Sequence, residues 1–290
     1  MGIFVSNGKI RPLWRVVIFI AIGYILQFAI TPLFGYLGSR FPSLNALSPQ
    51  AVIFGEAFIF IAALIGTAIW ARYERTRIDS YGLPIDKALS RPFWDGLLVG
   101  FAGPGLVGIG MLALHGWVVQ GFNLHGSEWL IFPLGWLIAN IVIGISEEAW
   151  YRAYALQTLT KSLGFWPAAV LLSLMFTADH YFFKPGENIW DVISLFSLGL
   201  FICMSVQRTG ALWFGVGFHI AFDFVQLFVI GTPNGGQVPV GRLFVSAFPG
   251  PAWVNGGSLG TEASALMYPV IAAMYVYLLV RYPKAQAFTS

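Results

Sequence analysis

Charged residues are scarce in this sequence. Asp, Glu, Lys and Arg make up 10% of its 290 residues, whereas apolar residues make up 57% and aromatic residues 17%. A soluble domain carries about a quarter charged residues, and a water-soluble fold of this length has no core large enough for so much apolar side chain. The same composition excludes a disordered chain. The sequence therefore predicts a polytopic membrane protein.

The sequence also has only one cysteine and no strong net charge. The one cysteine, Cys203, lies inside an apolar run and has no second cysteine with which to form a disulfide. The formal net charge is only +3. The basic residues lie at the ends of apolar runs, which is typical of membrane topology and not of a nucleic-acid-binding surface. We expect a lipid bilayer around the chain and no nucleic acid among its partners.

Eight apolar runs are long enough, or nearly so, to cross about 30 Å of hydrocarbon as helices. They cover residues 13–37, 51–71, 94–119, 129–146, 166–183, 190–207, 211–231 and 264–281. The first run is too long for the apolar part of a signal peptide. The fourth is expected to continue as a helix beyond Ser146, because no Gly or Pro follows before Gly164. We predict an all-α polytopic transmembrane bundle of about eight spans.

The chain shows no internal repeat and no separate soluble domain. We divide it where the fourth run begins: residues 1–128 hold the first three helices, and residues 129–290 hold helices four to eight of the same bundle, with the residues that suggest catalysis. The longest connection, about 232–263, is rich in Gly and Pro. It is predicted to be either a surface loop or a partly re-entrant segment.

Lys and Arg are distributed unequally between the two sides of the predicted bundle. With the N-terminus inside, 13 of the 16 fall on the inner side, and only Arg40, Lys184 and Arg242 fall on the outer side. Cytoplasmic loops of membrane proteins carry the excess of Lys and Arg. We therefore predict an integral, multi-pass membrane protein with both termini in the cytoplasm.

Ionisable residues inside apolar spans are costly and therefore suggest function. The fourth run ends in Glu147 and Glu148, and Arg152 follows. At helical spacing Glu148 and Arg152 are i,i+4 neighbours that can form an ion pair, whereas Glu147 has Tyr151 at that position. Glu147 is thus a candidate general base or acid. The alternative is a solvated helix end.

Two further spans carry histidines. His180 lies late in the fifth run beside Asp179, which can face solvent at the end of the span. His219 and Asp223 lie in the middle of the seventh run, where i,i+4 spacing places an imidazole and a carboxylate on one helical face. This arrangement suits a hydrogen-bonded pair, a metal half-site or a proton relay. Glu56, near the start of the second run, is either interfacial or paired within the bundle.

If the three helices converge, Glu147, His180, His219 and Asp223 supply the groups of an active site. A glutamate can deprotonate water, histidines can stabilise an oxyanion or protonate a leaving amine, and Asp223 can orient His219. No serine or cysteine lies in a recognised nucleophile motif. Along the chain His180 lies near the outer end of its span and Glu147 closer to the inner side, so long or tilted helices are needed to bring them together.

The three segments together resemble the family of CAAX prenyl endopeptidases and bacteriocin-processing or immunity proteins, often called the Abi or CPBP family. The family pattern is Glu-Glu-x-x-x-Arg, then Phe-x-x-x-His, then His-x-x-x-Asn/Asp, each in a separate membrane helix. The resemblance covers roughly residues 130–282, and the segment from Gly257 to Glu262 is similar to a Gly-rich segment of many bacterial members. The motifs are here Glu147-Glu148-x-x-x-Arg152, Phe176-x-x-x-His180 and His219-x-x-x-Asp223, in the same order.

The resemblance implies an intramembrane endopeptidase with eight helices and a site that opens to the cytoplasm. By analogy, Glu147 activates a water with the help of His180, while His219 and Asp223 stabilise the oxyanion. The family positions of Glu148 and Arg152 are supporting ones. The implied substrate is a peptide or protein with a lipidated or hydrophobic C-terminus, prenylated in the eukaryotic branch, and the implied location is a bacterial or archaeal cytoplasmic membrane.

Asp223 stands where the prenyl endopeptidases have Asn. An ionised Asp cannot donate a hydrogen bond to an oxyanion, so it is protonated, acts through His219 or has another role. A zinc-dependent membrane protease is therefore an alternative, with Glu147, His180, His219 and Asp223 as the ligands of Zn²⁺. We favour catalysis by glutamate without a metal or other cofactor.

Two functions of other classes remain as alternatives. The first is a non-proteolytic immunity or partner-binding membrane protein that keeps the site as a binding pocket. The second is a proton-coupled transporter, with Glu147 and the histidines as a relay. Internal repeats or paired broken helices would favour a transporter, and the sequence shows neither.

Overall fold

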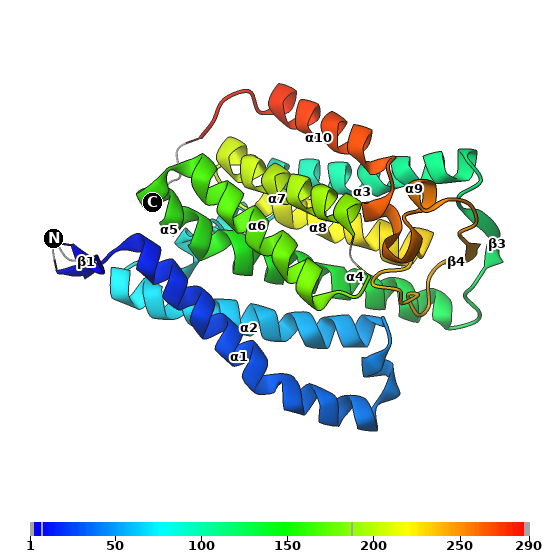
Figure 1. The fold of residues 1–290 in the computed structure, drawn as a ribbon, viewed down its shortest axis with the longest axis horizontal. Helices are drawn as coiled ribbons and strands as arrows, with labels where there is room; N and C mark the ends of the chain where they lie inside the picture. The colour runs from blue at the N-terminus through cyan, green and yellow to red at the C-terminus, as the bar shows by residue number, and fades with distance from the viewer. Residues whose placement is uncertain (1–2, 7, 187, 287–290) are drawn as a thin grey trace.

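The computed structural model describes residues 3–6, 8–186 and 188–286 and shows a bundle of long helices (Figure 1). The α-helices are α1 (Pro12–Arg40), α2 (Pro49–Glu74), α3 (Arg91–Ala113), α4 (Glu128–Glu148), α5 (Tyr154–Leu163), α6 (Phe165–Phe183), α7 (Ile189–Thr209), α8 (Trp213–Asp223), α9 (Ala252–Asn255) and α10 (Met267–Arg281). Two π-helical segments, η4 (Ala149–Ala153) and η5 (Phe224–Ile230), follow α4 and α8. The remaining elements are the 3-10 helices η1 (Pro42–Asn45), η2 (Ile78–Ser80), η3 (Ile85–Lys87) and η6 (Gly257–Ala263) and the strands β1 (Val5–Ser6), β2 (Lys9–Ile10), β3 (Val118–Phe122) and β4 (Phe244–Ala247).

Within the described ranges, seven helices are long and apolar enough to cross a membrane. The prediction of an all-α polytopic bundle is therefore confirmed. One of the seven is the continuous helix Glu128–Leu163, 36 residues long, which joins α4, η4 and α5; its continuation beyond Ser146 was predicted. The fifth predicted run, 166–183, corresponds to α6, a helix of 19 residues that contains Asp179 and His180 and is not among these seven.

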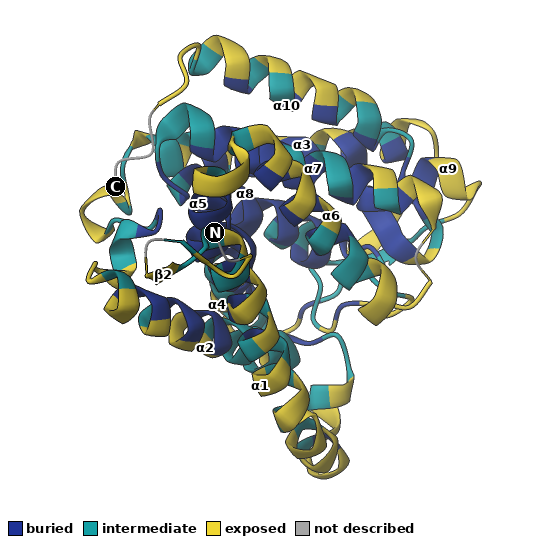
Figure 2. Cartoon of the chain, turned by 60° about the vertical axis from the view of Figure 1, so that its left-hand side comes forward, coloured by how far each residue is buried: buried dark blue, intermediate teal, exposed yellow. Residues whose placement is uncertain are grey.

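The central helix of the bundle is α8, which packs against α3, α4 and α7. Every residue from Phe214 to Asp223 is buried, and Figure 2 shows this helix in dark blue inside the bundle. Its close approach to α3 depends on glycine, because a Cβ on Gly96 or Gly100 would overlap a backbone carbonyl oxygen of α8. This Gly-x-x-x-Gly pair allows two helix backbones to meet, as in many membrane helix pairs. The residues of α8 are thereby held at the centre of the molecule.

The helices α1 and α2 form one side of the bundle, where α1 packs on α5 and α2 packs on α4. Trp150 of η4 is 2% exposed and its ring centre lies 5.3 Å from that of Phe19 in α1. A Cβ on Gly23 would overlap the Trp150 ring. The first half of α1 is thus fixed to the π-helical segment, whereas most of the second half is exposed (Figure 2).

The connections differ from the sequence prediction in two places. The third predicted run ends as a helix at Ala113, because His115 adopts a positive φ of 55° and residues 118–122 form β3, which pairs antiparallel with β4. The Gly- and Pro-rich connection is not only a surface loop. It returns into the bundle as η6, in which Thr261 and Glu262 are buried, so the re-entrant alternative describes this part of it.

Candidate active site

The first motif lies where α4 changes into a π-helical segment. Glu147 and Glu148 end α4, and Arg152 lies in η4. The third motif has the same arrangement, because His219 and Asp223 lie in α8 and η5 begins at the next residue. π-helical turns are rare and frequently occur at functional sites. In both helices the π-helical segment begins directly after the last acidic residue of the motif, Glu148 or Asp223.

Glu148 is a fully buried carboxylate. Its Oε1 accepts a hydrogen bond from Nη1 of Arg152 at 2.7 Å and lies 2.9 Å from Nδ1 of His219. The side chains of Glu148 and Arg152 are 0% and 1% exposed, so the predicted ion pair between them is confirmed. The expected partner of His219 is corrected: the carboxylate at its Nδ1 is Glu148, on another helix. Asp223, four residues along the same helix, is engaged by Gln226 instead.

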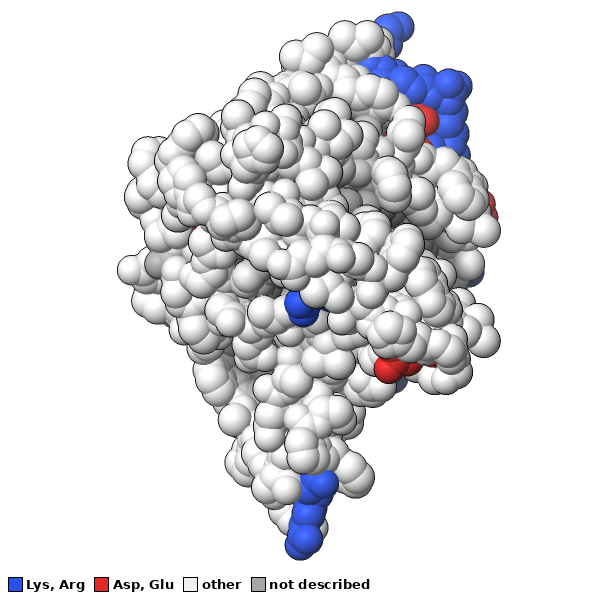
Figure 3. Space-filling view, turned by 90° about the vertical axis from the view of Figure 1, so that its right-hand side faces the viewer, with Lys and Arg blue, Asp and Glu red and all other residues white. Residues whose placement is uncertain are grey.

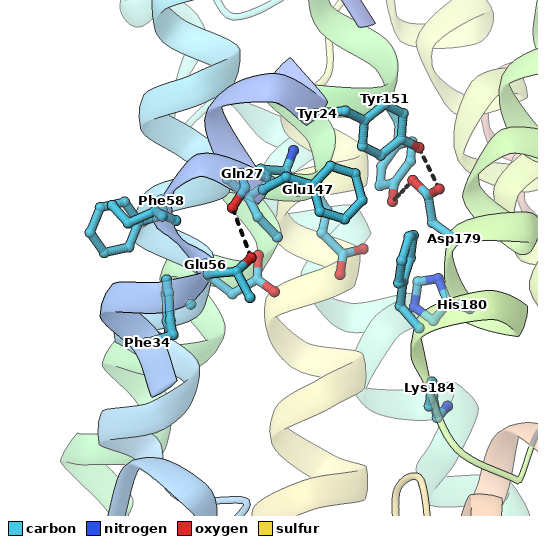
Figure 4. Close-up of a pocket in the computed structure, with 16 residues that line it drawn as sticks. Tyr24, Gln27, Phe34, Glu56, Phe58, Glu147, Tyr151, Asp179, His180 and Lys184 are labelled. Carbon is cyan, nitrogen blue, oxygen red and sulfur yellow. Dashed lines mark hydrogen bonds between the residues drawn. The ribbon is translucent and has the colours of Figure 1, made fainter. Parts of the chain in front are cut away.

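Glu147 faces the other nitrogen of the same imidazole. Its Oε2 lies 3.3 Å from Nε2 of His219 and accepts no hydrogen bond from the residues that the structure describes. Because Nδ1 of His219 donates to Glu148, Nε2 and the Glu147 carboxyl group can share a single proton between them. The Glu147 side chain is 14% exposed and borders the cavity shown in Figure 4. Glu147 is therefore the carboxylate of this motif that a water in the cavity can reach.

The second motif is joined to the first through Phe176. The guanidinium carbon of Arg152 lies 5.0 Å from the centre of the Phe176 ring, and the His180 ring centre lies 4.4 Å from it. Nδ1 of His180 lies 2.9 Å from the carbonyl oxygen of Phe176. Because a carbonyl oxygen only accepts, Nδ1 carries a proton, and Nε2 is the basic nitrogen of the neutral ring. Phe176 thus positions both Arg152 and His180.

The different sequence depths of Glu147 and His180 do not separate them in the structure. Glu147 lies near the middle of the 36-residue helix Glu128–Leu163, so it is not at a solvated helix end and that alternative is wrong. Both residues border the same two cavities. The length of this helix brings Glu147 to the level of His180.

Asp223 belongs to a chain of polar contacts that the sequence did not reveal. Its Oδ1 accepts a hydrogen bond from Nε2 of Gln226 at 2.8 Å, and the same amide donates to Oε1 of Glu262 at 3.2 Å. Oε2 of Glu262 lies 3.1 Å from Nζ of Lys184. The hydroxyl group of Thr261 donates to Oε1 of Gln226 at 2.8 Å, which fixes the orientation of the amide. The position of Asp223 therefore depends on η6 and on the end of α6.

The surroundings of two acidic residues could not be predicted from their neighbours in the sequence. For Glu56 the sequence left two alternatives, and for Asp179 it suggested a solvent-facing position. Glu56 of α2 accepts a hydrogen bond from Ser146, the residue before Glu147, so the alternative of pairing within the bundle is right. Asp179 does not simply face solvent, because the hydroxyl groups of Tyr24 and Tyr151 donate to its carboxylate. A carboxylate inside an apolar run was the available signal for Glu56. Nothing in local spacing pointed to the tyrosines.

Two cavities of about 460 and 420 Å³ share the residues of the site. Both are bordered by Glu56, Glu147, His180 and Lys184. The first lies between α1, α2 and α6, and apolar side chains form much of its wall (Figure 4): Phe28, Phe34, Phe58 and Phe183. The second also reaches His219, Asp223 and Glu262 and continues to three loops. The candidate residues thus border a space with an apolar side and a polar side.

The alternative zinc set does not have the geometry of a metal site. In the described part of the chain, no three His, Cys, Asp or Glu side chains are grouped so that they could hold one metal ion. His219 has a carboxylate at each ring nitrogen, and Asp223 accepts from an amide.

The fold and the site define an integral, multi-pass membrane protein with acid and base groups at a cavity between its helices. Residues 129–225 match the family model of Type II CAAX prenyl endopeptidase Rce1-like proteins. This stretch contains all three motifs, so the match confirms the resemblance that they indicated. A comparison with curated proteins finds no match to the chain.

We expect Arg152→Ala to lower the free energy of unfolding by about 3–5 kcal/mol, because removing one partner leaves a buried carboxylate uncompensated. Arg77→Ala is the matched control. Arg77 also pairs with an acid, Asp79, at 2.9 Å, but its side chain is 83% exposed, and such surface pairs contribute about 0–1 kcal/mol. Thermal unfolding in detergent compares the variants. An Arg152→Ala protein as stable as the control would contradict the central role of this ion pair.

Proposed function

We propose that the chain is an intramembrane endopeptidase that uses a glutamate-activated water to cut a peptide with a lipidated or hydrophobic C-terminus. The observation that carries the proposal is the position of Glu147. Its carboxylate borders a cavity and faces Nε2 of His219, while the other ring nitrogen is engaged by Glu148. A base beside an oriented imidazole is the arrangement that acid–base hydrolysis requires.

The proposed reaction begins with the Glu147 carboxylate. It takes a proton from a water, whose oxygen adds to the carbonyl carbon of the scissile peptide bond. The protonated Glu147 then donates this proton to the leaving nitrogen as the carbon–nitrogen bond breaks, which gives a carboxylic acid and a free amine. No covalent intermediate with the protein is needed, in agreement with the lack of a serine or cysteine nucleophile motif.

The histidines have separate roles in this proposal. Nε2 of His219, when protonated, donates a hydrogen bond to the oxyanion of the tetrahedral intermediate. Glu148 holds the ring in the orientation that this requires, since its Oε1 lies 2.9 Å from Nδ1. His180 borders the same two cavities as Glu147 and helps it to orient the water. Glu148 and Arg152 act through His219 and Phe176, so they are positioning residues.

The walls of the first cavity favour an apolar substrate. Phenylalanine side chains from α1, α2 and α6 line it, and Glu147 and His180 lie on the same lining. A lipid chain or a hydrophobic peptide segment can occupy such a space and gains the free energy of apolar burial. This supports the proposed class of substrate, in which the apolar group lies beside the bond that is cut.

We expect Glu147→Gln to lower the rate of peptide cleavage by about 10²–10⁴-fold, because an amide cannot accept the proton of water. The assay uses purified protein and two peptides of one sequence, with and without a C-terminal prenyl group. Glu128→Gln is the matched control, since Glu128 begins the same helix and contacts the backbone of His125 far from the site. Unchanged cleavage by a folded Glu147→Gln protein would contradict the assigned role. If the Glu147→Gln protein kept its full biological function without cleaving peptides, the alternative of a non-proteolytic immunity or partner-binding protein would be favoured.

Asp223→Asn is expected to preserve or raise cleavage. An amide donates a hydrogen bond to an oxyanion without first having to be protonated, whereas an ionised carboxylate cannot donate. Asp223→Leu, of similar size, removes the polar group and is expected to lower the rate. If the Asn and Leu variants lost activity equally, the site would need the carboxylate itself, and a role in the oxyanion site would be wrong.

Removal of divalent metal is expected to leave cleavage unchanged. The purified protein is assayed across a series of chelator concentrations, with added Zn²⁺ as the reverse test. Activity that survives complete removal of metal agrees with catalysis by Glu147. Activity that is lost with the chelator and restored by Zn²⁺ would instead favour the zinc-dependent alternative.

A further inference from the structure

The second cavity opens at one end of the bundle. Its lining runs from Glu147 and His219 to three connections: the α1–α2 loop with Asn45, the turn after α6 with Pro185, and the segment after η5 with Gln237. Asn45, Pro185 and Gln237 are exposed. We call this set of connections the mouth of the cavity. A molecule that enters there meets the candidate catalytic groups without passing through the rest of the bundle.

Both termini lie at the opposite end of the molecule. The backbone N–H of Ile10 donates to the hydroxyl group of Tyr73 near the end of α2, and that of Gln286 donates to the carbonyl oxygen of Gln207 near the end of α7. Helices α2 and α7 each begin at the mouth, with Pro49 and Ile189. A helix of more than 20 residues spans about 30 Å or more. Figure 1 shows N and C together at one end, away from β3 and β4.

This geometry makes two of the sequence expectations incompatible. The excess of Lys and Arg predicts cytoplasmic termini, whereas the family resemblance implies a site that opens to the cytoplasm. Since the mouth and the termini lie at opposite ends, only one of these expectations can hold for this chain. The distribution of charge in the structure decides between them.

Basic residues gather at the end that carries the termini. Of the 16 Lys and Arg, Arg152 is buried in the site, three lie toward the mouth (Arg40, Lys184 and Arg242) and 12 lie at the other end. Ion pairs tie several of these 12 together at that end, such as Arg15 and Lys161 with Glu74, and Arg281 with Asp95. Figure 3 looks onto the end away from the termini and shows a mostly uncharged surface. By the positive-inside rule the end with the termini is cytoplasmic.

We propose that the cavity opens on the non-cytoplasmic side of the membrane and that the site acts on exported hydrophobic or lipidated polypeptides. This inference rests on the proposed function only for the class of substrate; the direction of the mouth follows from geometry and charge. A substrate segment that has crossed the membrane, or is anchored with its polar part outside, reaches Glu147 through the mouth. A substrate confined to the cytoplasm meets the basic end of the bundle, opposite the mouth.

The orientation is tested by cysteine labelling in intact cells. The single native cysteine, Cys203, is 0% exposed, so a Cys203→Ser background adds few changes. Gln237→Cys and Asn45→Cys place a thiol at the mouth. Asp86→Cys and Lys87→Cys place one at the other end, where both native residues are exposed. Two positions at each end keep the test valid if one variant does not fold. A membrane-impermeant maleimide is applied before and after permeabilisation.

The proposal predicts that both mouth positions are labelled in intact cells and that both positions at the other end are labelled only after permeabilisation. The reverse pattern would overturn the proposal. Labelling does not depend on catalysis, so the same experiment is done with Glu147→Gln added. A protein that cleaves peptides but shows the reverse labelling keeps the proposed function and loses this inference. A protein with the expected labelling and no peptidase activity keeps this inference and loses the proposed function.

Discussion

One buried carboxylate connects the parts of the site. Oε1 of Glu148 contacts both Arg152 and His219, and Arg152 packs on Phe176, which positions His180. A charged group in an apolar bundle is costly unless it is paired and hydrogen-bonded. Burial of Glu148 therefore forces α4, η4 and α8 into one arrangement, and α6 follows through the aromatic ring. The three motifs form a single unit because each depends on this contact.

Glu147 and Glu148 are neighbours in sequence with opposite environments. Successive residues of a helix point about 100° apart, so one carboxylate enters the core and the other borders the cavity. Oε1 of the buried group contacts a cation and an imidazole, and the neighbouring Glu147 keeps an oxygen without a hydrogen bond from the described residues. The π-helical segment that follows carries Arg152 and Trp150. The pair thus combines a structural charge with a group available for chemistry.

Much of the fold and part of the site follow from local pattern. Apolar runs predicted the spans, and i,i+4 spacing predicted the contact between Glu148 and Arg152, because both depend on residues close in the chain. The prediction that Asp223 orients His219 was wrong, because the carboxylate at Nδ1 of His219 belongs to Glu148 on another helix. The tyrosine partners of Asp179 were missed for the same reason. Residues that meet across helices leave no spacing in the sequence by which to recognise them.

By itself, the sequence determined the class of protein, the positions of the helices and the unequal charge of the two sides. These properties depend on composition and on local periodicity, which the chain carries before it folds. Only the tertiary structure decided that Glu148 orients His219, that Glu56 lies beside the site and that the mouth lies opposite the termini. Each of these depends on how separate helices cross and pack. A cavity leaves no local pattern in the sequence, because it is the space that remains between packed helices.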